Sequence, residues 1–183
     1  MEGVESVNIL ESLYHDITKP PTPAHMGEAF HLWMYYQAVA EARALLLVMV
    51  NHTNDSELKE LMEHFVADVM EPQIGMVKKL LLAEGISLPA VTPDPARADQ
   101  AEIPSGARLV DQQIAKMNMV KVLGMIDLCY QAIRFSFRSD ISAMFGRFQG
   151  HVGAQGYTLR ELMLKRGWIS YPPLPHGGGS PRT

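Results

Sequence analysis

The sequence ISLPAVTPDPARADQAEIPSG, residues 86–106, separates two pairs of long periodic segments and decides how they are connected. Four of the chain's 12 prolines lie in these 21 residues, so neither flanking helix can continue through them. A chain of this length reaches roughly 70 Å when extended, whereas a 30-residue helix is about 45 Å long. Structureless connections this long are uncommon unless they have to span a distance. We therefore expect residues 86–106 to run the whole length of a helical bundle.

Four segments have the apolar periodicity of long helices, and no segment alternates apolar and polar residues as a strand would. They cover approximately residues 23–52, 55–84, 108–137 and 139–167. Pro23 follows a Thr22 cap where the first helix starts, and Gly85 and Gly167 end the second and fourth helices. Pro72 is expected to kink the second helix, because it has no N–H for the helical ladder.

A long crossover between the second and third helices makes them parallel, which is the arrangement of ferritin-like bundles. The sequence thus predicts an all-α fold, a ferritin-like four-helix bundle of two helical hairpins with a long crossover. An amphipathic segment over residues 7–17 predicts a short N-terminal helix before the bundle. We assign residues 1–175 to this single domain. Residues 176–183, with three glycines and a proline, are expected to form a flexible C-terminal tail.

The ends of the second and fourth helices resemble each other. Residues 80–86, LLLAEGI, align with residues 162–168, LMLKRGW, at an offset of 82 positions, and the same offset aligns Gln73 with Gln155. This similarity suggests two hairpins related by a pseudo-twofold axis. The alternative is a chance likeness between two leucine-rich helix ends.

The composition is that of a globular protein: 183 residues, 47% hydrophobic and 20% charged, with a formal net charge of −4. A mildly acidic chain without basic runs is a poor candidate for binding nucleic acid or an anionic membrane. The longest purely apolar run, residues 44–50, is far shorter than the roughly 18 residues that cross a bilayer. The acidic residues 1–5 do not resemble a signal peptide, and the single cysteine, Cys129, suits a reducing compartment. We therefore expect a cytoplasmic protein without nucleic-acid or membrane partners.

Helical wheels assign a core side to each helix. In the first helix, the wheel puts Phe30 and Trp33 inside and Glu28 outside. The third helix is apolar almost all round, and Leu123, Ile126 and Tyr130 fit its core side best. The expected core stripe of the second helix consists of Leu58, Met62, Phe65, Val66, Val69, Gln73, Met76 and Leu80. That of the fourth consists of Ile141, Met144, Phe145, Phe148, His151, Val152, Gln155, Leu159 and Leu162.

A small set of polar residues is expected to face inward near the middle of the bundle. Its members are Gln37, Glu41, Gln73, Asp127, His151 and Gln155. Burying such groups without partners costs a few kcal/mol each, so they must meet one another, water or a ligand. One interpretation is a hydrogen-bonded core network. The other is a metal or catalytic site of Glu41 and His151, supported by Gln37, Gln73, Asp127 and Gln155.

A paired-metal centre is not expected. Such centres in helical bundles take Glu from two helices and Glu-x-x-His from the other two. No Glu-x-x-His occurs in the second or fourth helix, where Met70 and Val152 precede Gln73 and Gln155 by three residues. Amides and apolar side chains are poor ligands for hard cations. We therefore expect no cofactor, while Glu41 and His151 leave room for a single divalent metal ion.

Small residues line the side of the fourth helix opposite its core stripe. They are Ala143, Gly146, Gly150, Gly153, Ala154 and, next to them, Tyr157. Each glycine inside a helix costs about 0.5–1 kcal/mol relative to alanine, so three on one face require a reason. A flat face allows another helix to approach closely. We expect a homodimer through this face, or its packing against the N-terminal segment, with a flexible, kinked helix as the alternative.

Several motifs resemble those of one protein family. They are Thr22-Pro23-Ala24-His25-Met26-Gly27, Arg138-Ser139-Asp140, and residues 162–167 with Pro172-Pro173 after them. With the aromatic residues of the first helix, they are similar to a ferritin-like domain-of-unknown-function family of endospore-forming bacteria, some members of which are labelled spore coat proteins. The resemblance covers about residues 20–175 and implies a ferritin-like bundle and a spore association, with no defined activity.

Two function classes follow. The first is a non-enzymatic structural or interaction protein, dimeric, with the spore-coat-like role that the resemblance implies. The alternative is a metal- or ligand-binding bundle with a carboxylate–imidazole site in mid-bundle and redox activity. The fold cannot decide between them, because four-helix bundles host many functions.

Overall fold

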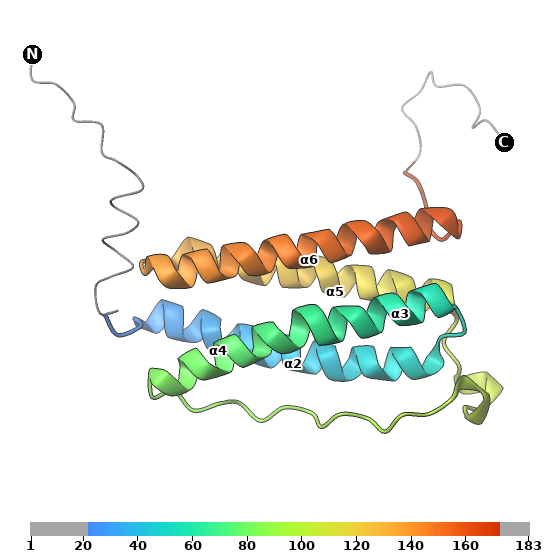
Figure 1. Ribbon diagram of the computed structural model, residues 1–183, viewed down its shortest axis with the longest axis horizontal. Coiled ribbons are helices and arrows are strands. Elements are labelled where there is room, and N and C mark those ends of the chain that lie inside the picture. The colour runs from blue at the N-terminus through green and yellow to red at the C-terminus, as the bar shows by residue number, and fades with distance from the viewer. Residues whose placement is uncertain (1–21, 173–183) are drawn as a thin grey trace, which may run out of the picture.

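The computed structural model describes residues 22–172 and contains four long helical rods that lie side by side (Figure 1). The first rod is α2 (Met26–His52), and the second is α3 (Ser56–His64), the π-helix η1 (Phe65–Met70) and α4 (Glu71–Ala83). The third and fourth rods are α5 (Asp111–Phe135) and α6 (Ser139–Lys165). Two 3₁₀ turns, η2 (Gln100–Glu102) and η3 (Ser105–Ala107), precede α5. The predicted N-terminal helix and C-terminal tail lie outside the described residues.

The connection after α4 runs back along the whole bundle, so α3–α4 and α5 are parallel (Figure 1). Side chains of α2 hold it: the Trp33 Nε1–H donates to the Ser87 carbonyl at 3.2 Å, and the Asn51 amide donates to the Ala96 carbonyl at 2.8 Å. The predicted ferritin-like bundle of two hairpins with a long crossover is confirmed. Its described part contains no strand.

The two hairpins are related as the sequence duplication suggests. Gly85 and Gly167 both have positive φ, 72° and 69°, where a residue with a Cβ would be strained. Each follows a helix end closed by the same bond, Ile86 N–H to the Leu81 carbonyl and Trp168 N–H to the Met163 carbonyl, both 2.9 Å. Buried residues also match at the offset of 82, as in Gln73 and Gln155. These matches support the pseudo-twofold relation over chance likeness.

The predicted core side of α2 is correct for Ala40 and Ala44 and wrong for Phe30 and Glu28. Phe30 is exposed, whereas Glu28 is only 2% exposed, and the core side is built from Leu32, Tyr35, Tyr36, Val39, Ala40, Ala44, Leu46, Met49 and Val50. Apolar residues occur on all sides of α2. The bundle covers one side of this helix, and part of the opposite side contacts the crossover. A wheel cannot choose between two apolar sides.

The second rod follows the predicted stripe through Leu58, Met62, Phe65 and Val66 and then shifts by one residue. Its later buried residues are Met70, Gln73, Val77 and Leu81, whereas the predicted Met76 is exposed. The shift occurs at η1, where the Glu71 N–H bonds to the Val66 carbonyl, five residues back. Pro72 follows directly, so a π-helical turn accompanies the proline where a kink was expected.

The predictions for the last two rods differ in outcome. On α6 every predicted core residue is buried except His151, which is exposed. On α5 the predicted Leu123 and Tyr130 are exposed, and Ile126 only packs against the edge of the core. The buried residues of α5 are Ile114, Ala115, Asn118, Val122, Met125, Cys129 and Ala132. Both sides of α5 carry apolar residues, which is why its wheel was ambiguous.

Gly156 lets α6 approach α5 closely. A Cβ at this position would lie 2.8 Å from Cγ1 of Val122, whereas a Cβ at Gly75 on α4 would meet no atom within 4 Å. We expect Gly156→Ala to lower the free energy of unfolding by about 1–3 kcal/mol through overpacking. Gly75→Ala should raise it by about 0.5–1 kcal/mol. Urea unfolding of both variants checks this, and a stabilising Gly156→Ala would contradict the close approach.

Candidate functional site

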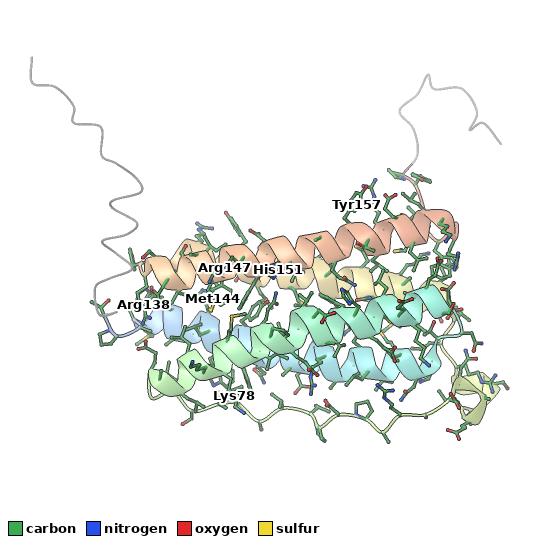
Figure 2. All side chains as sticks on the ribbon, viewed as in Figure 1. Lys78, Arg138, Met144, Arg147, His151 and Tyr157 are labelled. Atoms are coloured by element: carbon green, nitrogen blue, oxygen red, sulfur yellow. The ribbon has the colours of Figure 1, made fainter. Side chains whose placement is uncertain are left out.

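Glu41 and His151, the predicted metal pair, do not meet in the bundle interior. The Glu41 carboxylate accepts a 2.8 Å hydrogen bond from the Thr92 N–H of the crossover, a contact that lowers its pKa. His151 is exposed midway along α6 (Figure 2) and lines a groove that Glu41 does not reach. Because the wheels of α2 and α6 place both residues at the edge of an apolar stripe, a small error in either assignment moves them outside. The predicted pairing is therefore wrong.

The other predicted site residues are also separated. Asp127 is exposed and Gln37 is half-buried, so neither belongs to a buried polar cluster. Gln155 is buried, and its Nε2 donates to the Leu61 carbonyl at 3.1 Å. Gln73 is buried against α2. Only these two amides, related by the offset of 82, are inside as predicted.

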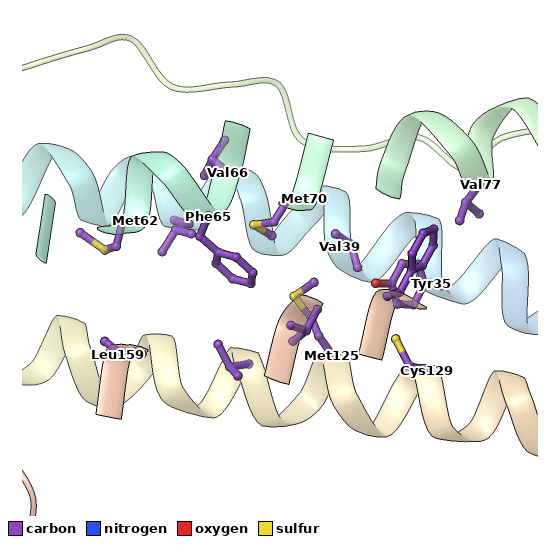
Figure 3. Packing of buried hydrophobic residues seen from close by; sticks show 14 of the residues in the cluster. Tyr35, Val39, Met62, Phe65, Val66, Met70, Val77, Met125, Cys129 and Leu159 are labelled. Atoms are coloured by element: carbon purple, nitrogen blue, oxygen red, sulfur yellow. The ribbon is translucent and has the colours of Figure 1, made fainter. Parts of the chain in front are cut away.

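Tyr35, which sequence reasoning missed, is the polar residue that connects the four rods. Its hydroxyl donates to Oε1 of Gln73 at 2.6 Å, and its ring contacts the rings of Phe145 and Phe148 at centroid distances of 5.1 and 5.6 Å. It faces Cys129 of α5 (Figure 3). Burial raises the pKa of the Tyr35 hydroxyl well above its ordinary range, and it raises the pKa of the Cys129 thiol to about 11. Both groups stay protonated at neutral pH, which agrees with an unreactive thiol.

The interior does not offer the ligands of a paired-metal centre. Met70 and Val152 lie where such centres place Glu. The side-chain oxygen of Gln73 already accepts a hydrogen bond from the Tyr35 hydroxyl. Asn118 on α5 is fully buried, and neither atom of its amide has a hydrogen-bond partner. Amides, a phenol and hydrocarbon do not suit a hard cation. Within residues 22–172, no group of three or more His, Cys, Asp or Glu is arranged to hold a metal ion.

Asn118 could have been found in the sequence by its spacing from other core residues. It lies four residues after Ile114 and four before Val122, both buried, so it shares their face of α5. The spacing did not identify the core face of α5, because the opposite face carries apolar residues as well.

A groove of about 1010 Å³ opens between α3–η1 and α6. It forms there because α6 packs along α5, whereas its contacts with α3 and η1 are sparse. The apolar residues that line the groove are Leu61, Val69 and Leu162, with the exposed Ala154 at its edge, and the buried Gln155 lies among them. Charged and polar residues form its walls: Glu57, Glu60, His64 and Asp68 on the α3–η1 side, and His151, Thr158, Glu161 and Lys165 on α6. The His64 Nδ1 contacts the Asp68 carboxylate, and the Lys165 Nζ is 2.7 Å from Glu57 Oε1.

The outer face of the α5–α6 pair presents small and apolar residues to solvent. A Cβ added at Gly146, Gly150 or Gly153 would meet no atom within 4 Å, so no part of residues 22–172 covers these glycines. On α5, Val120 is 69% exposed and Tyr130 is 55% exposed. Ala154, predicted for this face, instead lines the groove.

A buried ionic cluster joins the ends of all four rods. The Glu28 Oε1 accepts from the N–H groups of Phe137 and Arg138 at 2.9 and 2.8 Å. The Arg138 guanidinium bonds to Asp140, to Glu84 after α4, and to the Thr22 carbonyl at 3.1 Å. Arg138 is only 8% exposed. The cluster therefore fixes the start of α6 against the start of α2 and the end of α4.

Similar proteins carry little functional description. A model of a protein family of unknown function, DUF3231, matches residues 13–177. The uncharacterized protein YvdQ of Bacillus subtilis (strain 168) is 32% identical over 152 residues, 83% of this chain and 89% of that protein. No helix among residues 22–172 is long and apolar enough to cross a membrane.

Two crystal structures resemble the bundle. A "putative spore coat protein" of Bacillus halodurans C-125 superposes with a TM-score of 0.80 and 31% identity, over 84% of this chain and 96% of that one. A two-domain protein of Anabaena variabilis, containing DJ-1/ThiJ/PfpI-like and ferritin-like domains, gives a TM-score of 0.63 at 13% identity, over 98% of this chain and 48% of that one. The second likeness supports the ferritin-like fold alone.

Proposed function

The chain belongs to the DUF3231 family of proteins of unknown function, and from this premise we propose that it is a non-enzymatic structural protein that forms homodimers and has a coat-like, spore-associated role. The spore association rests on the description of the similar Bacillus halodurans protein. The argument for a dimer rests on the residues of α6 in this chain.

The observation that carries the proposal is the uncovered glycine row of α6. Gly146, Gly150 and Gly153 each destabilise the helix by about 0.5–1 kcal/mol relative to alanine. Gly156 has a reason within the chain, its contact with Val122, but a Cβ at the other three positions would meet nothing within 4 Å. A second helix at this face would approach the backbone closely and would use the three glycines together. The neighbouring helix α5 also exposes apolar side chains, those of Val120 and Tyr130, which suit a protein interface.

The dimer is tested by placing a large charged side chain in this face. We expect the wild-type protein to have twice its chain mass of 20.4 kDa in light scattering, and Gly150→Arg to have the mass of one chain. Gly75→Arg is the matched control, because Gly75 is also an exposed helical glycine with no atom within 4 Å of an added Cβ. It should remain dimeric. A wild-type protein that stays monomeric at its highest soluble concentration would refute the proposal.

A second candidate function, ligand binding, is favoured by the groove beside α6. The groove is lined by His64 and His151 from opposite walls and by the carboxylates of Asp68 and Glu161, although these four side chains are not gathered around one point as metal ligands would be. Elemental analysis of the purified protein tests the metal form of this function. Stoichiometric iron, manganese or zinc that is lost in His151→Ala would favour ligand binding over the structural role.

A further inference from the structure

The groove between α3–η1 and α6 combines an apolar floor with an acidic rim. Leu61 of α3 and Leu162 of α6 line it from opposite walls, and Val69 of η1 adds a third apolar side chain. Four carboxylates line the groove, those of Glu57, Glu60, Asp68 and Glu161. Glu57 is bound by Lys165 at 2.7 Å and by Arg166 at 2.6 Å, and Asp68 contacts His64. Among the described residues, Glu60 and Glu161 have no ion-pair partner and supply the free negative charge of the rim. The groove therefore attracts cations along its edges and apolar groups at its base.

We propose that this groove docks a basic amphipathic helix of a partner protein, with apolar side chains on the floor and lysine or arginine side chains on the acidic rim. Charge complementarity selects a cationic occupant. The apolar residues of the groove require an occupant that also has apolar side chains. A hydrophilic polycation would not meet this requirement.

The shape of the groove favours a helix over an extended peptide. The walls are helices whose backbone groups are already hydrogen-bonded, so they offer an extended chain no edge for strand addition. A helix satisfies its own backbone and needs only side-chain contacts. Leu61 and Val69 are separated by about 12 Å along their rod, which matches anchor residues spaced by two turns on a docked helix.

The size of the groove favours a peptide over a small molecule. Its volume of about 1010 Å³ is at the upper limit of ordinary small-molecule pockets, and it is open along its length. A small ligand would leave much of its surface in water. A helix that lies along the groove would cover the floor continuously.

The η1 turn shapes one wall of the groove. The π-helical residues Asp68 and Val69 both line it, one on the rim and one on the floor. π-Helical turns are rare and often occur at functional sites. At this turn the core stripe of the second rod shifts by one residue, and Val69, predicted for the core, lies on the groove floor instead.

Fluorescence anisotropy with a labelled model helix of leucine and lysine tests the proposal on the full-length protein. We expect this peptide to bind in physiological salt, and the counterpart with glutamate in place of lysine not to bind. Glu60→Lys combined with Glu161→Lys should weaken binding at least 10-fold. The matched control combines Glu102→Lys with Asp127→Lys, which changes the net charge equally at exposed residues outside the groove. It should change the affinity less than two-fold.

A steric variant separates docking from adsorption to an acidic surface. Ala154→Trp places a bulky side chain at the edge of the groove without a change of charge and should also weaken binding at least 10-fold, whereas Ala83→Trp on the exposed side of α4 should have no effect. The proposal would be overturned if the leucine–lysine helix did not bind, if both charge pairs weakened it equally, or if Ala154→Trp left the affinity unchanged. None of these results depends on the dimer, which is measured separately by mass.

Discussion

Replacing Arg138 with Met is expected to lower the free energy of unfolding by about 3–5 kcal/mol, because it leaves the largely buried Glu84 carboxylate without its cation, whereas the exposed Asp140 contributes little. Arg138 is the positive member of a group in which Glu84 and Asp140 are both bound to its guanidinium. Methionine keeps most of the apolar stem, so the loss reports the missing charge more than missing packing. Urea unfolding at neutral pH measures it.

Arg166 provides the matched control at the opposite end of the bundle. It closes α6 through Asp55, the residue that caps α3, with a 2.6 Å bond from Nε to Oδ2. Its position corresponds to that of Glu84 at the offset of 82, so each hairpin has one member of an ion pair next to the glycine that ends its second helix. Arg166 is more exposed than Arg138, and exposed pairs stabilise little. Arg166→Met should therefore destabilise much less, and equal losses would contradict the burial argument.

The pH dependence of stability gives Arg138→Met a second readout. The Ala24 N–H and the Arg138 guanidinium hold the pKa of Glu84 below its ordinary value of 4.5, and Arg138 likewise lowers the pKa of Asp140. A carboxylate with a lowered pKa in the folded state stabilises the fold above its unfolded pKa, and this contribution disappears as the pH falls through the folded value. The wild-type protein should lose stability below about pH 4.5, and Arg138→Met should lose less over the same range. An unchanged acid dependence would mean that Arg138 does not stabilise these carboxylates.

The architecture was predictable because it depends on chain breaks and on one-sided helices. Residues 86–106 carry prolines and the length of a crossover, and Gly85 and Gly167 mark two helix ends. On α6 the apolar residues occupy one side, so the wheel found its core apart from the buried Met163, which it missed, and the exposed His151, which it included. The interaction of the crossover with α2 could not be predicted, because the Thr92 N–H has no sequence signature that assigns it to Glu41.

The site residues were less predictable, because a wheel locates a buried polar residue only on a helix with one apolar side. Two of the six expected inward polar residues, Gln73 and Gln155, are buried, and both lie on helices with a clear apolar stripe. Tyr35 and Asn118 lie on α2 and α5, whose apolar residues surround the helix. Such helices conceal a buried polar residue, because every position on them looks equally suited to the core.

Asn118→Leu is expected to raise the free energy of unfolding by about 1–3 kcal/mol, an unusual sign for a core substitution. Asn118 is 0% exposed, and its Nδ2 and Oδ1 both lack partners. Its burial therefore carries the desolvation cost of an amide with no hydrogen bond in return. Leucine has a similar shape, removes that cost and adds apolar contact with the surrounding core.

Gln73→Leu should have the opposite effect, although it also replaces a buried amide with the same apolar side chain. The Gln73 oxygen accepts a hydrogen bond from the Tyr35 hydroxyl at 2.6 Å, so its removal leaves this buried O–H with only the weakly accepting Cys129 sulfur beside it and should lower stability by about 1–3 kcal/mol. Thermal or urea unfolding of the two variants under one condition gives the comparison. If Asn118→Leu were destabilising as well, its amide would have to be bonded in solution, to ordered water or to a ligand inside the bundle. The apolar interior around α5 would then be a polar site.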